Sequence, residues 1–340
     1  MKIYQIENFE NFKKFHYLYS DKDINDYQVF QSYDFLQNYI KFFNHEKYKI
    51  IIYTDGNKFL ILPLYEFRYF TFNYMGFIGS PYLSEQNDII HNINDKIEIF
   101  KALDEIFIFL KKRNIKNFYF NNLKKNFFVD YLISINFSVL SSQKLNLCSI
   151  ENGVFCDETT KIKENNKIDF KIRKFSKNIK KKLKPINDIN YMDENLTNEI
   201  IDFIVSNKKL NFIYKKKFIK NLDFIIYLHK NTKLIILNEL KIDNEIVSLI
   251  LGFMFKKNFY YSIPVYNNIY NKYTFGKYHL RDFLKSASEN FKHIIFGPGP
   301  EIYKKKFNLT EDRLITLSND KKMLVIKYLK NILSDKKINK

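Results

Sequence analysis

Apolar residues in the first half of the chain follow two different periods. They recur at helical spacing in residues 30–43 and again in residues 95–113. Between these stretches, two apolar runs flank Asp55-Gly56, which predicts a hairpin because a tight primed turn needs a positive φ that glycine adopts without steric cost. Residues 117–123 (NFYFNNL) then read as a strand. The pattern predicts helix, antiparallel hairpin, helix and strand in that order.

The second half of the chain repeats this order. Its predicted elements are two helices, three strands of an antiparallel meander, a helix and a strand, at residues 196–207, 215–230, 233–240, 245–255, 259–266, 275–290 and 293–296. Asp243-Asn244 and Lys256-Lys257-Asn258 are the expected turns of the meander. A polar stretch at residues 151–166 separates the two halves. We therefore expect an α/β (α+β) protein with lobes at 1–155 and 156–340, each a mixed, mostly antiparallel sheet flanked by helices; two generic α+β domains are the alternative.

The length and composition fit a globular protein of two domains. The chain has 340 residues, of which 46% are hydrophobic and 27% charged. No apolar run is long enough to span a membrane, and charged residues interrupt the first fifteen positions, so we expect neither a membrane helix nor a secretory signal. A cytoplasmic location follows as an expectation.

The net charge of +19 comes from 56 lysines and arginines against 37 aspartates and glutamates. Such an excess is typical of a protein with an anionic partner, such as nucleic acid, CoA phosphates, a nucleotide-linked sugar or acidic lipid. However, Lys, Asn, Ile, Phe and Tyr are all abundant, and their codons are rich in A and T. A base-composition bias is the simpler explanation for most of the charge, so the charge alone identifies no partner.

Several kinds of site have no signature in this sequence. The two cysteines, Cys148 and Cys156, lack metal-ligand spacing, and the six histidines form no close pair, so we expect no metal site. The nucleophile motif GxSxG, the phosphate loop GxxxxGK[ST] and the dinucleotide motif GxGxxG are all missing. These absences argue against common hydrolases, P-loop NTPases and dehydrogenases.

The loop and helix at residues 266–291 form the first candidate site. A helix start near Phe275 presents unpaired N–H groups and the positive end of the dipole, which favour a phosphate. Thr274 is a possible N-cap, Gly276 would let a pyrophosphate approach the backbone, and Lys277 and Arg281 add positive charge. The alternative is an ordinary junction between a loop and a helix.

The segment at residues 294–307 is the second candidate. A strand runs into Gly297-Pro298-Gly299-Pro300, so the chain must turn sharply. Glu301, Tyr303 and Lys304 follow at once. An acid, a phenol and an amine at the end of a strand are well placed for a site, although a turn with exposed polar residues is the equally simple alternative.

A basic amphipathic segment at residues 171–185 is the third. Ile172, Phe175, Ile179 and Leu183 predict an apolar helical stripe among lysines, with Pro185 ending the helix. Such a helix can lie on a membrane or bind nucleic acid. We favour the alternative, a surface helix with a solvated lysine face.

Taken in order, these stretches resemble the GNAT-fold acyltransferase family that includes the CelD-type proteins of cellulose biosynthesis, and more distantly the FemAB-type transferases. The resembling pieces are FQSYDFLQNYIKFF, FLILPL, NYMGFIGSPYL, KIRKFSKNIKKKL, NEIVSLILGFMF, YNNIYNKYTFGKYHL and FGPGPEIYKKKF, which span roughly residues 28 to 310. The last is the most specific. Two positions depart from the family pattern: Phe275-Gly276 replaces a frequent Pro-Gly, and Ile295 stands where an acid usually precedes the last aromatic.

The resemblance implies a tandem GNAT-like fold and transfer of an acyl group from acyl-CoA, such as acetyl-CoA, to an amine or hydroxyl of a sugar or another small acceptor. The donor would bind the second lobe, where the backbone of a central strand, around Leu251, Gly252 and Phe253, would stabilise the oxyanion. The start of the following helix would complete the donor site with Thr274, Phe275, Gly276, Lys277 and Arg281. Glu301 would be the general base and Tyr303 the acid that protonates the thiolate. Lys304 and Tyr273 would contact the acceptor.

Two other functions stay open. A FemAB-like transferase would use aminoacyl-tRNA, for which the positive charge is favourable. A catalytically silent member would instead bind an anionic polymer or nucleic acid through the basic segment.

Overall fold

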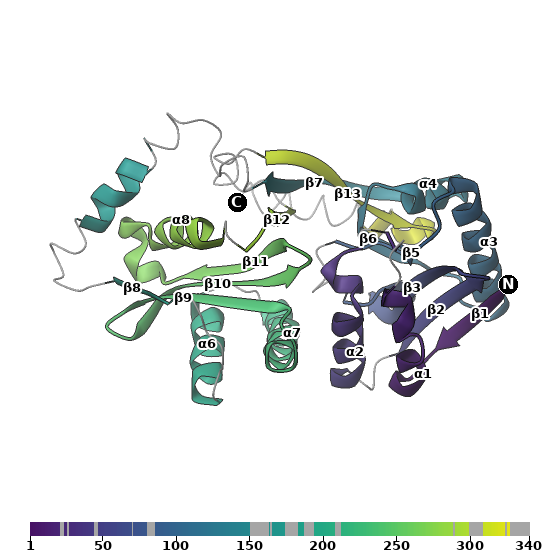
Figure 1. The fold of residues 1–340 in the computed structure, drawn as a ribbon, viewed down its shortest axis with the longest axis horizontal. Helices are drawn as coiled ribbons and strands as arrows, with labels where there is room; N and C mark the ends of the chain where they lie inside the picture. The colour runs from purple at the N-terminus through teal and green to yellow at the C-terminus, as the bar shows by residue number, and fades with distance from the viewer. Residues whose placement is uncertain are drawn as a thin grey trace. The chain divides into compact units, whose positions relative to one another are not determined.

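The computed structural model describes residues 1–20, 24–25, 27–43, 47–69, 71–79, 86–149, 163, 165–173, 183–186, 194–207, 212–287, 290–298, 309–323 and 325–326. The chain forms two compact units, unit 1 (Met1–Lys144 and Asp312–Lys340) and unit 2 (Leu145–Glu311), which are coloured along the chain in Figure 1. Each unit combines helices with a mostly antiparallel sheet, as expected.

The division differs from the expected boundary at residues 155 and 156 because strand pairing crosses it. Strand β7 (Ser138–Ser149) begins in unit 1 and ends in unit 2. Strand β13 (Leu309–Ser318) lies far along the sequence, yet its residues from Leu314 to Ser318 pair with β6 (Tyr119–Lys124) of unit 1. Hydrophobic periodicity reports neither pairing, so the C-terminal residues were expected in the wrong lobe.

Unit 1 is built on an antiparallel meander. Its strands are β1 (Lys2–Ile6), β2 (Tyr48–Asp55), β3 (Lys58–Tyr69) and β4 (Phe72–Phe77), in that order across the sheet, with β5 (Ile90–His91) paired to β3. The predicted hairpin between β2 and β3 is confirmed: Asp55 pairs with Lys58, and Gly56 has φ +59°. The turn therefore uses the left-handed conformation that glycine favours.

The helices of unit 1 cover both faces of this sheet. They are α1 (Phe9–Lys13), α2 (Tyr33–Phe42), α3 (Lys96–Lys112), α4 (Phe127–Ser134) and the 3-10 helices η1 (His16–Ser20) and η2 (Val29–Gln31). Figure 1 shows α1 and α2 on one side and α3 and α4 on the other. Helix α3 begins where Asp95 accepts a hydrogen bond from the N–H of Ile97, and its apolar stripe, including Leu103 and Ile106, is fully buried.

Unit 2 has the second predicted meander. Its elements are β8 (Leu183–Ile186), α6 (Glu194–Asn207), α7 (Phe212–Asn231), β9 (Ile235–Ile242), β10 (Glu245–Phe255), β11 (Asn258–Tyr266), η3 (Asn268–Tyr273), α8 (Phe275–Ala287) and β12 (His293–Pro298). Asp243-Asn244 and Lys256-Lys257 have positive φ, as a primed turn requires, so both expected turns are confirmed. Helix α8 lies on one side of the sheet, and α6 and α7 lie on the other (Figure 1).

The predicted basic helix at residues 171–185 is wrong at its C-terminal end. Residues 165–173 are helical, but Leu183–Ile186 form β8 and pair with β9 through Leu183–Ile242 and Pro185–Leu240. Residues 174–182 lie outside the described part of the chain. A proline in a strand at the end of a sheet is consistent with the strand's edge position, because proline has no N–H to donate.

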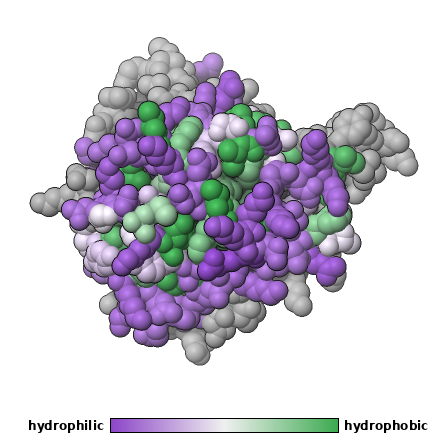
Figure 2. Space-filling model, turned by 90° about the vertical axis from the view of Figure 1, so that its right-hand side faces the viewer, coloured by the Kyte–Doolittle hydropathy of each residue, from purple (hydrophilic) through white to green (hydrophobic). Residues whose placement is uncertain are grey.

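The face of the molecule drawn in Figure 2 is largely polar where its residues are described. Figure 2 shows hydrophilic side chains over most of one face, with hydrophobic side chains in small groups among them. Single exposed apolar residues such as Ile97, Ile108 and Phe127 lie on α3 and α4. None of the helices in the described ranges has the length and apolar character to cross a bilayer, and those ranges contain no cluster of acidic, histidine or cysteine side chains arranged to hold a metal.

Replacing Gly252 by alanine is expected to destabilise unit 2. A Cβ atom there would lie 2.3 Å from the carbonyl oxygen of Tyr260 and 2.5 Å from Cζ of Phe259, so β10 and β11 would have to separate. Overpacking of this kind costs roughly 1–3 kcal/mol, which urea unfolding measures. Gly56→Asn is the control, because a Cβ atom at position 56 meets nothing within 4 Å and asparagine tolerates positive φ. Equal stability of Gly252→Ala and the wild type would contradict the packing argument.

Candidate active site

Two parallel strands diverge within unit 2, and this divergence defines the candidate site. Strands β11 and β12 are joined by α8 and pair in parallel from Asn258–His293 to Tyr260–Ile295. Beyond Tyr260, β11 continues to Tyr266 alongside β10, while no residue of β12 is paired with it. The second half of β11 therefore has a strand neighbour on one edge and diverges from β12 on the other. A ligand carrying amide groups could extend the sheet at such an edge.

Strand β12 changes direction where it leaves β11. Its pairing with β7 shifts register between Ile295 and Pro298, and Gly297 has φ +68°. Ile295 is buried and lies between Tyr260 and Leu147 in the sheet. An acid at position 295, as in the resembling family, would be surrounded by packed strands, so isoleucine suits this position structurally.

Residues Leu251, Gly252 and Phe253 occupy the interior of β10. They pair with β9 on one side and with β11 on the other, with a bulge between Leu251 and Gly252 on the β11 side. The side chains of Leu251 and Phe253 are buried. The backbone of β10 is paired with a strand on each side. The diverging half of β11 is therefore better placed than these three residues to stabilise an oxyanion.

The start of α8 lies against the end of β11. The carbonyl oxygen of Thr274 accepts hydrogen bonds from the N–H groups of Lys277 and Tyr278 at 3.0 and 3.1 Å, which starts the helix. A Cβ atom on Gly276 would lie 3.0 Å from Cδ1 of Tyr266, the last residue of β11. The first-turn N–H groups of a helix have no partner within it. The structure thus brings the predicted anion site beside the diverging strand.

The side chain of Thr274 is a further polar feature of this helix start. Thr274 has φ +59°, an unusual conformation for a β-branched residue, and its Oγ1 is buried with no hydrogen-bond partner among the described residues. A buried hydroxyl without a partner is costly. Strain and an unused hydroxyl therefore coincide at the predicted phosphate position.

The other predicted residues of this helix have different surroundings. Tyr273 and Phe275 are buried in a core cluster with Leu240 and Ile242, so a donor could use only their backbone. Lys277 is exposed. Arg281 is 9% exposed, and its guanidinium lies 2.6 Å from Oδ1 of Asp169 and over the ring of Tyr278. Arg281 therefore holds α8 against the helix at residues 165–173, and its charge is already neutralised.

A buried polar network beneath α8 was not predicted from the sequence. The imidazole of His279 lies 2.9 Å from Oγ of Ser248 through Nδ1 and 2.6 Å from Oδ1 of Asn238 through Nε2, and all three residues are buried. Burial lowers the pKa of His279 to about 3. The neutral imidazole satisfies both contacts if Nε2–H donates to Asn238 and the Ser248 hydroxyl donates to Nδ1 in place of its more distant acceptor, the Val265 carbonyl at 3.3 Å. Because these residues come from β9, β10 and α8, only the folded sheet unites them.

The three residues expected to carry chemistry, Glu301, Tyr303 and Lys304, lie outside the described residues. The described chain leads to them through β12, which ends at Pro298. Their roles stay predictions.

In unit 1, the corresponding space between parallel strands is filled by the chain itself. Strand β4 precedes α3 and β6 follows it, and Met75 and Phe118 form a parallel bridge. Further along β6, the N–H of Asn87 donates to the carbonyl of Asn122 at 2.8 Å, and the N–H of Lys124 donates to the carbonyl of Asn87 at 3.2 Å. Asn87 is fully buried. In unit 1, the backbone of Asn87 therefore pairs with β6, the strand that follows the helix as β12 does in unit 2.

Comparisons with known proteins agree with this arrangement. Residues 230–305, which include β9, β10, β11, α8 and β12, match the family described as "Acetyltransferase (GNAT) domain". No curated protein matches the sequence. The match to this family falls in the part of the sequence where the divergent strands lie.

Solved structures with low sequence identity share the whole two-lobed fold. A conserved protein of unknown function from Bacteroides thetaiotaomicron has a TM-score of 0.57 at 11% identity, with 93% of this chain and 99% of that chain covered. The C-terminal domain of a putative lysylphosphatidylglycerol synthetase from Agrobacterium fabrum has 0.54 at 8%, covering 86% and 90%. FemX has 0.51 at 9%, covering 94% and 97%. The predicted tandem GNAT fold is confirmed, and the family match supports a transferase of acyl groups.

Glu239 provides a test of the buried polar groups in unit 2. Its side chain is fully buried on β9, Lys241 Nζ lies 2.9 Å from Oε2, and neither oxygen accepts a well-oriented hydrogen bond from the described residues. Burial raises the pKa of Glu239 above its ordinary 4.5, although Lys241 opposes the shift. The folded chain therefore binds more protons than the unfolded chain just above pH 4.5, and this group lowers stability as the pH rises through that window.

Glu239→Gln is expected to remove that part of the pH dependence. The free energy of unfolding of both proteins is measured in urea from pH 4.5 upward. As the pH rises, the variant should become more stable relative to the wild type, and this difference should then level off. Glu245→Gln, at an exposed glutamate of β10, is the control and should keep the wild-type slope. Parallel pH profiles for the wild type and Glu239→Gln would show that the burial of this carboxyl does not affect stability.

Proposed function

We propose that this chain is an acyltransferase that moves an acyl group from acyl-CoA to an amine or hydroxyl of a small acceptor, with the donor bound in unit 2. One observation carries the proposal: β11 and β12 separate after Tyr260, and the diverging half of β11 ends beside the start of α8. An acyl-CoA donor has amide groups along its arm and phosphates at its end. The amides can pair with the edge of a strand, and the phosphates can bind the N-terminus of the helix beside it.

The reaction on this scaffold is direct transfer. The acceptor nitrogen or oxygen attacks the thioester carbonyl, the C–S bond breaks after the tetrahedral intermediate, and the thiolate leaves with the CoA. Holding both reactants in one orientation supplies much of the rate. Backbone N–H groups on the diverging half of β11, residues 261–266, are our candidates to stabilise the oxyanion, although Pro264 has no N–H to donate.

Proton transfer is assigned to the segment after β12. Glu301 would take the proton from the attacking group. Tyr303 would donate a proton to the leaving thiolate. Lys304 would contact the acceptor or a phosphate. Support for these roles is their position in sequence directly after the strand that borders the donor site.

The acceptor proposed here is a sugar or amino-sugar, which rests on the resemblance to CelD-type proteins. The second candidate is an aminoacyl donor such as aminoacyl-tRNA. The C-terminal domain of a putative lysylphosphatidylglycerol synthetase shares this fold, and the net charge of +19 would help to bind tRNA.

Calorimetric titration with acetyl-CoA and longer acyl-CoAs tests the donor site. We expect micromolar binding with one site per chain, because unit 1 fills its own strand gap. Gly276→Trp should abolish binding, since its side chain must occupy the space in front of α8 next to Tyr266. Lys285→Trp, at the other end of α8, is the matched control and should bind normally. If no acyl-CoA binds the wild type but an aminoacyl-tRNA does, the second candidate replaces the first.

Glu301→Gln tests the general base. With a donor and acceptor identified, kcat should fall about 10²- to 10⁴-fold while donor affinity is retained, because general-base catalysis typically contributes that much. Steady-state kinetics with a matched donor titration separates the two effects. An unchanged kcat would remove Glu301 from the mechanism but leave the donor site intact.

A further inference from the structure

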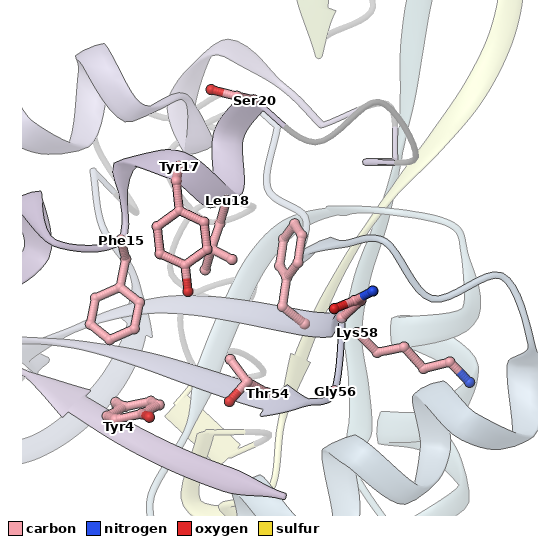
Figure 3. A pocket seen from close by; sticks show the side chains of 10 residues that line it. Tyr4, Phe15, Tyr17, Leu18, Ser20, Thr54, Gly56 and Lys58 are labelled. Atoms are coloured by element: carbon pink, nitrogen blue, oxygen red, sulfur yellow. The ribbon is translucent and has the colours of Figure 1, made fainter.

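Unit 1 contains an open cavity that is separate from the proposed donor site. It has a volume of about 450 Å³ and lies between η1 and the strands β1, β2 and β3. Figure 3 shows Tyr17, Leu18 and Ser20 on the side of η1, with Tyr4 and Thr54 opposite them on the strands. The remaining lining residues are Phe15, Gly56, Asn57, Lys58 and Phe59. A cavity of this size accommodates a small-molecule ligand.

The cavity wall combines aromatic rings with unused polar groups. The rings of Tyr4 and Phe15 are in contact, with centroids 5.1 Å apart and planes tilted by 57°, and Tyr17 is 63% exposed with its hydroxyl directed towards the strands (Figure 3). No described residue forms a hydrogen bond with the side chains of Tyr4, Tyr17, Ser20, Thr54 or Asn57. Four hydroxyls and one amide are therefore available around an aromatic floor.

The described residues that line the cavity carry no uncompensated charge, although the protein is strongly basic. Among them, Lys58 is the one ionisable residue besides the tyrosines, and its Nζ lies 2.6 Å from both carboxylate oxygens of Glu98. Figure 3 shows its side chain running away from the other lining groups. The described lining therefore offers an anionic ligand no free cation and a cationic ligand no free carboxylate. The wall therefore fits a neutral ligand with one apolar face and many hydroxyls.

We propose that this cavity binds a pyranose ring of a neutral saccharide. A pyranose has a face of C–H groups that packs on an aromatic ring and a rim of hydroxyls that exchange hydrogen bonds with serine, threonine, tyrosine and asparagine side chains. The open side, where Tyr17 is exposed, lets a second sugar unit extend into solvent. Unit 1 thereby has a binding function of its own, and this inference does not rest on the transfer reaction proposed for unit 2.

The experiment uses the full chain with glucose, N-acetylglucosamine and their β-1,4-linked disaccharides as probes. Saturation-transfer NMR should show transfer to the C–H protons of one ring, and calorimetry should give saturable binding. Tyr17→Ala should weaken binding about threefold to tenfold, the loss expected for one aromatic contact. Thr54→Val, which keeps the shape of the side chain but removes its hydroxyl, should weaken it as well.

Phe127→Ala is the matched control, because Phe127 is an exposed aromatic residue of unit 1 that does not line the cavity. Its affinity should equal that of the wild type. Three results would overturn the proposal: no saturable binding of any probe, equal affinities for the wild type and Tyr17→Ala, or tighter binding of adenine, a flat neutral heterocycle without hydroxyls. Binding of acyl-CoA is measured separately, so failure of either proposal leaves the other testable.

Discussion

The parallel pairing of β11 and β12 is the interaction on which the candidate site depends, and it extends only from Asn258–His293 to Tyr260–Ile295. Backbone groups within a sheet serve their neighbours, so a ligand can use them only where a neighbour is missing. The early end of this pairing leaves the second half of β11 with one strand neighbour. Because β11 ends beside the start of α8, the backbone N–H groups of the strand and those of the first helical turn lie close together.

The tightest packing in unit 2 maintains this geometry. Gly252 lets β10 approach β11 closely, and the His279 network ties α8 to β9 and β10 through neutral hydrogen bonds. Arg281 fixes the same helix from the side through Asp169. A neutral imidazole and a compensated guanidinium keep the position of α8 independent of pH near neutrality, which suits a helix whose start must stay aligned with a strand edge.

The two lobes repeat one topology but differ at the place that matters for binding. In unit 2, β11 diverges from β12 after Tyr260, whereas in unit 1 Asn87 pairs with β6, the strand after the helix, through two backbone hydrogen bonds. Unit 1 also has a cavity on the side of η1 whose described lining carries no uncompensated charge. The two ligands that we propose, an anionic donor with amides in unit 2 and a neutral polyhydroxylated ligand in unit 1, would each bind a surface that arises from local chain geometry.

The sequence by itself determined the two central meanders, their turns and the longer helices. Helical periodicity located α2, α3 and α8, and Asp55-Gly56, Asp243-Asn244 and Lys256-Lys257 identified the hairpins, because these signals depend on neighbouring residues alone. Tertiary structure decided the return of β13 to unit 1, the strand at Leu183–Ile186, the commitment of Arg281 to Asp169 and the burial of Tyr273 and Phe275. Each of these depends on contacts between residues distant in sequence, which local periodicity does not report.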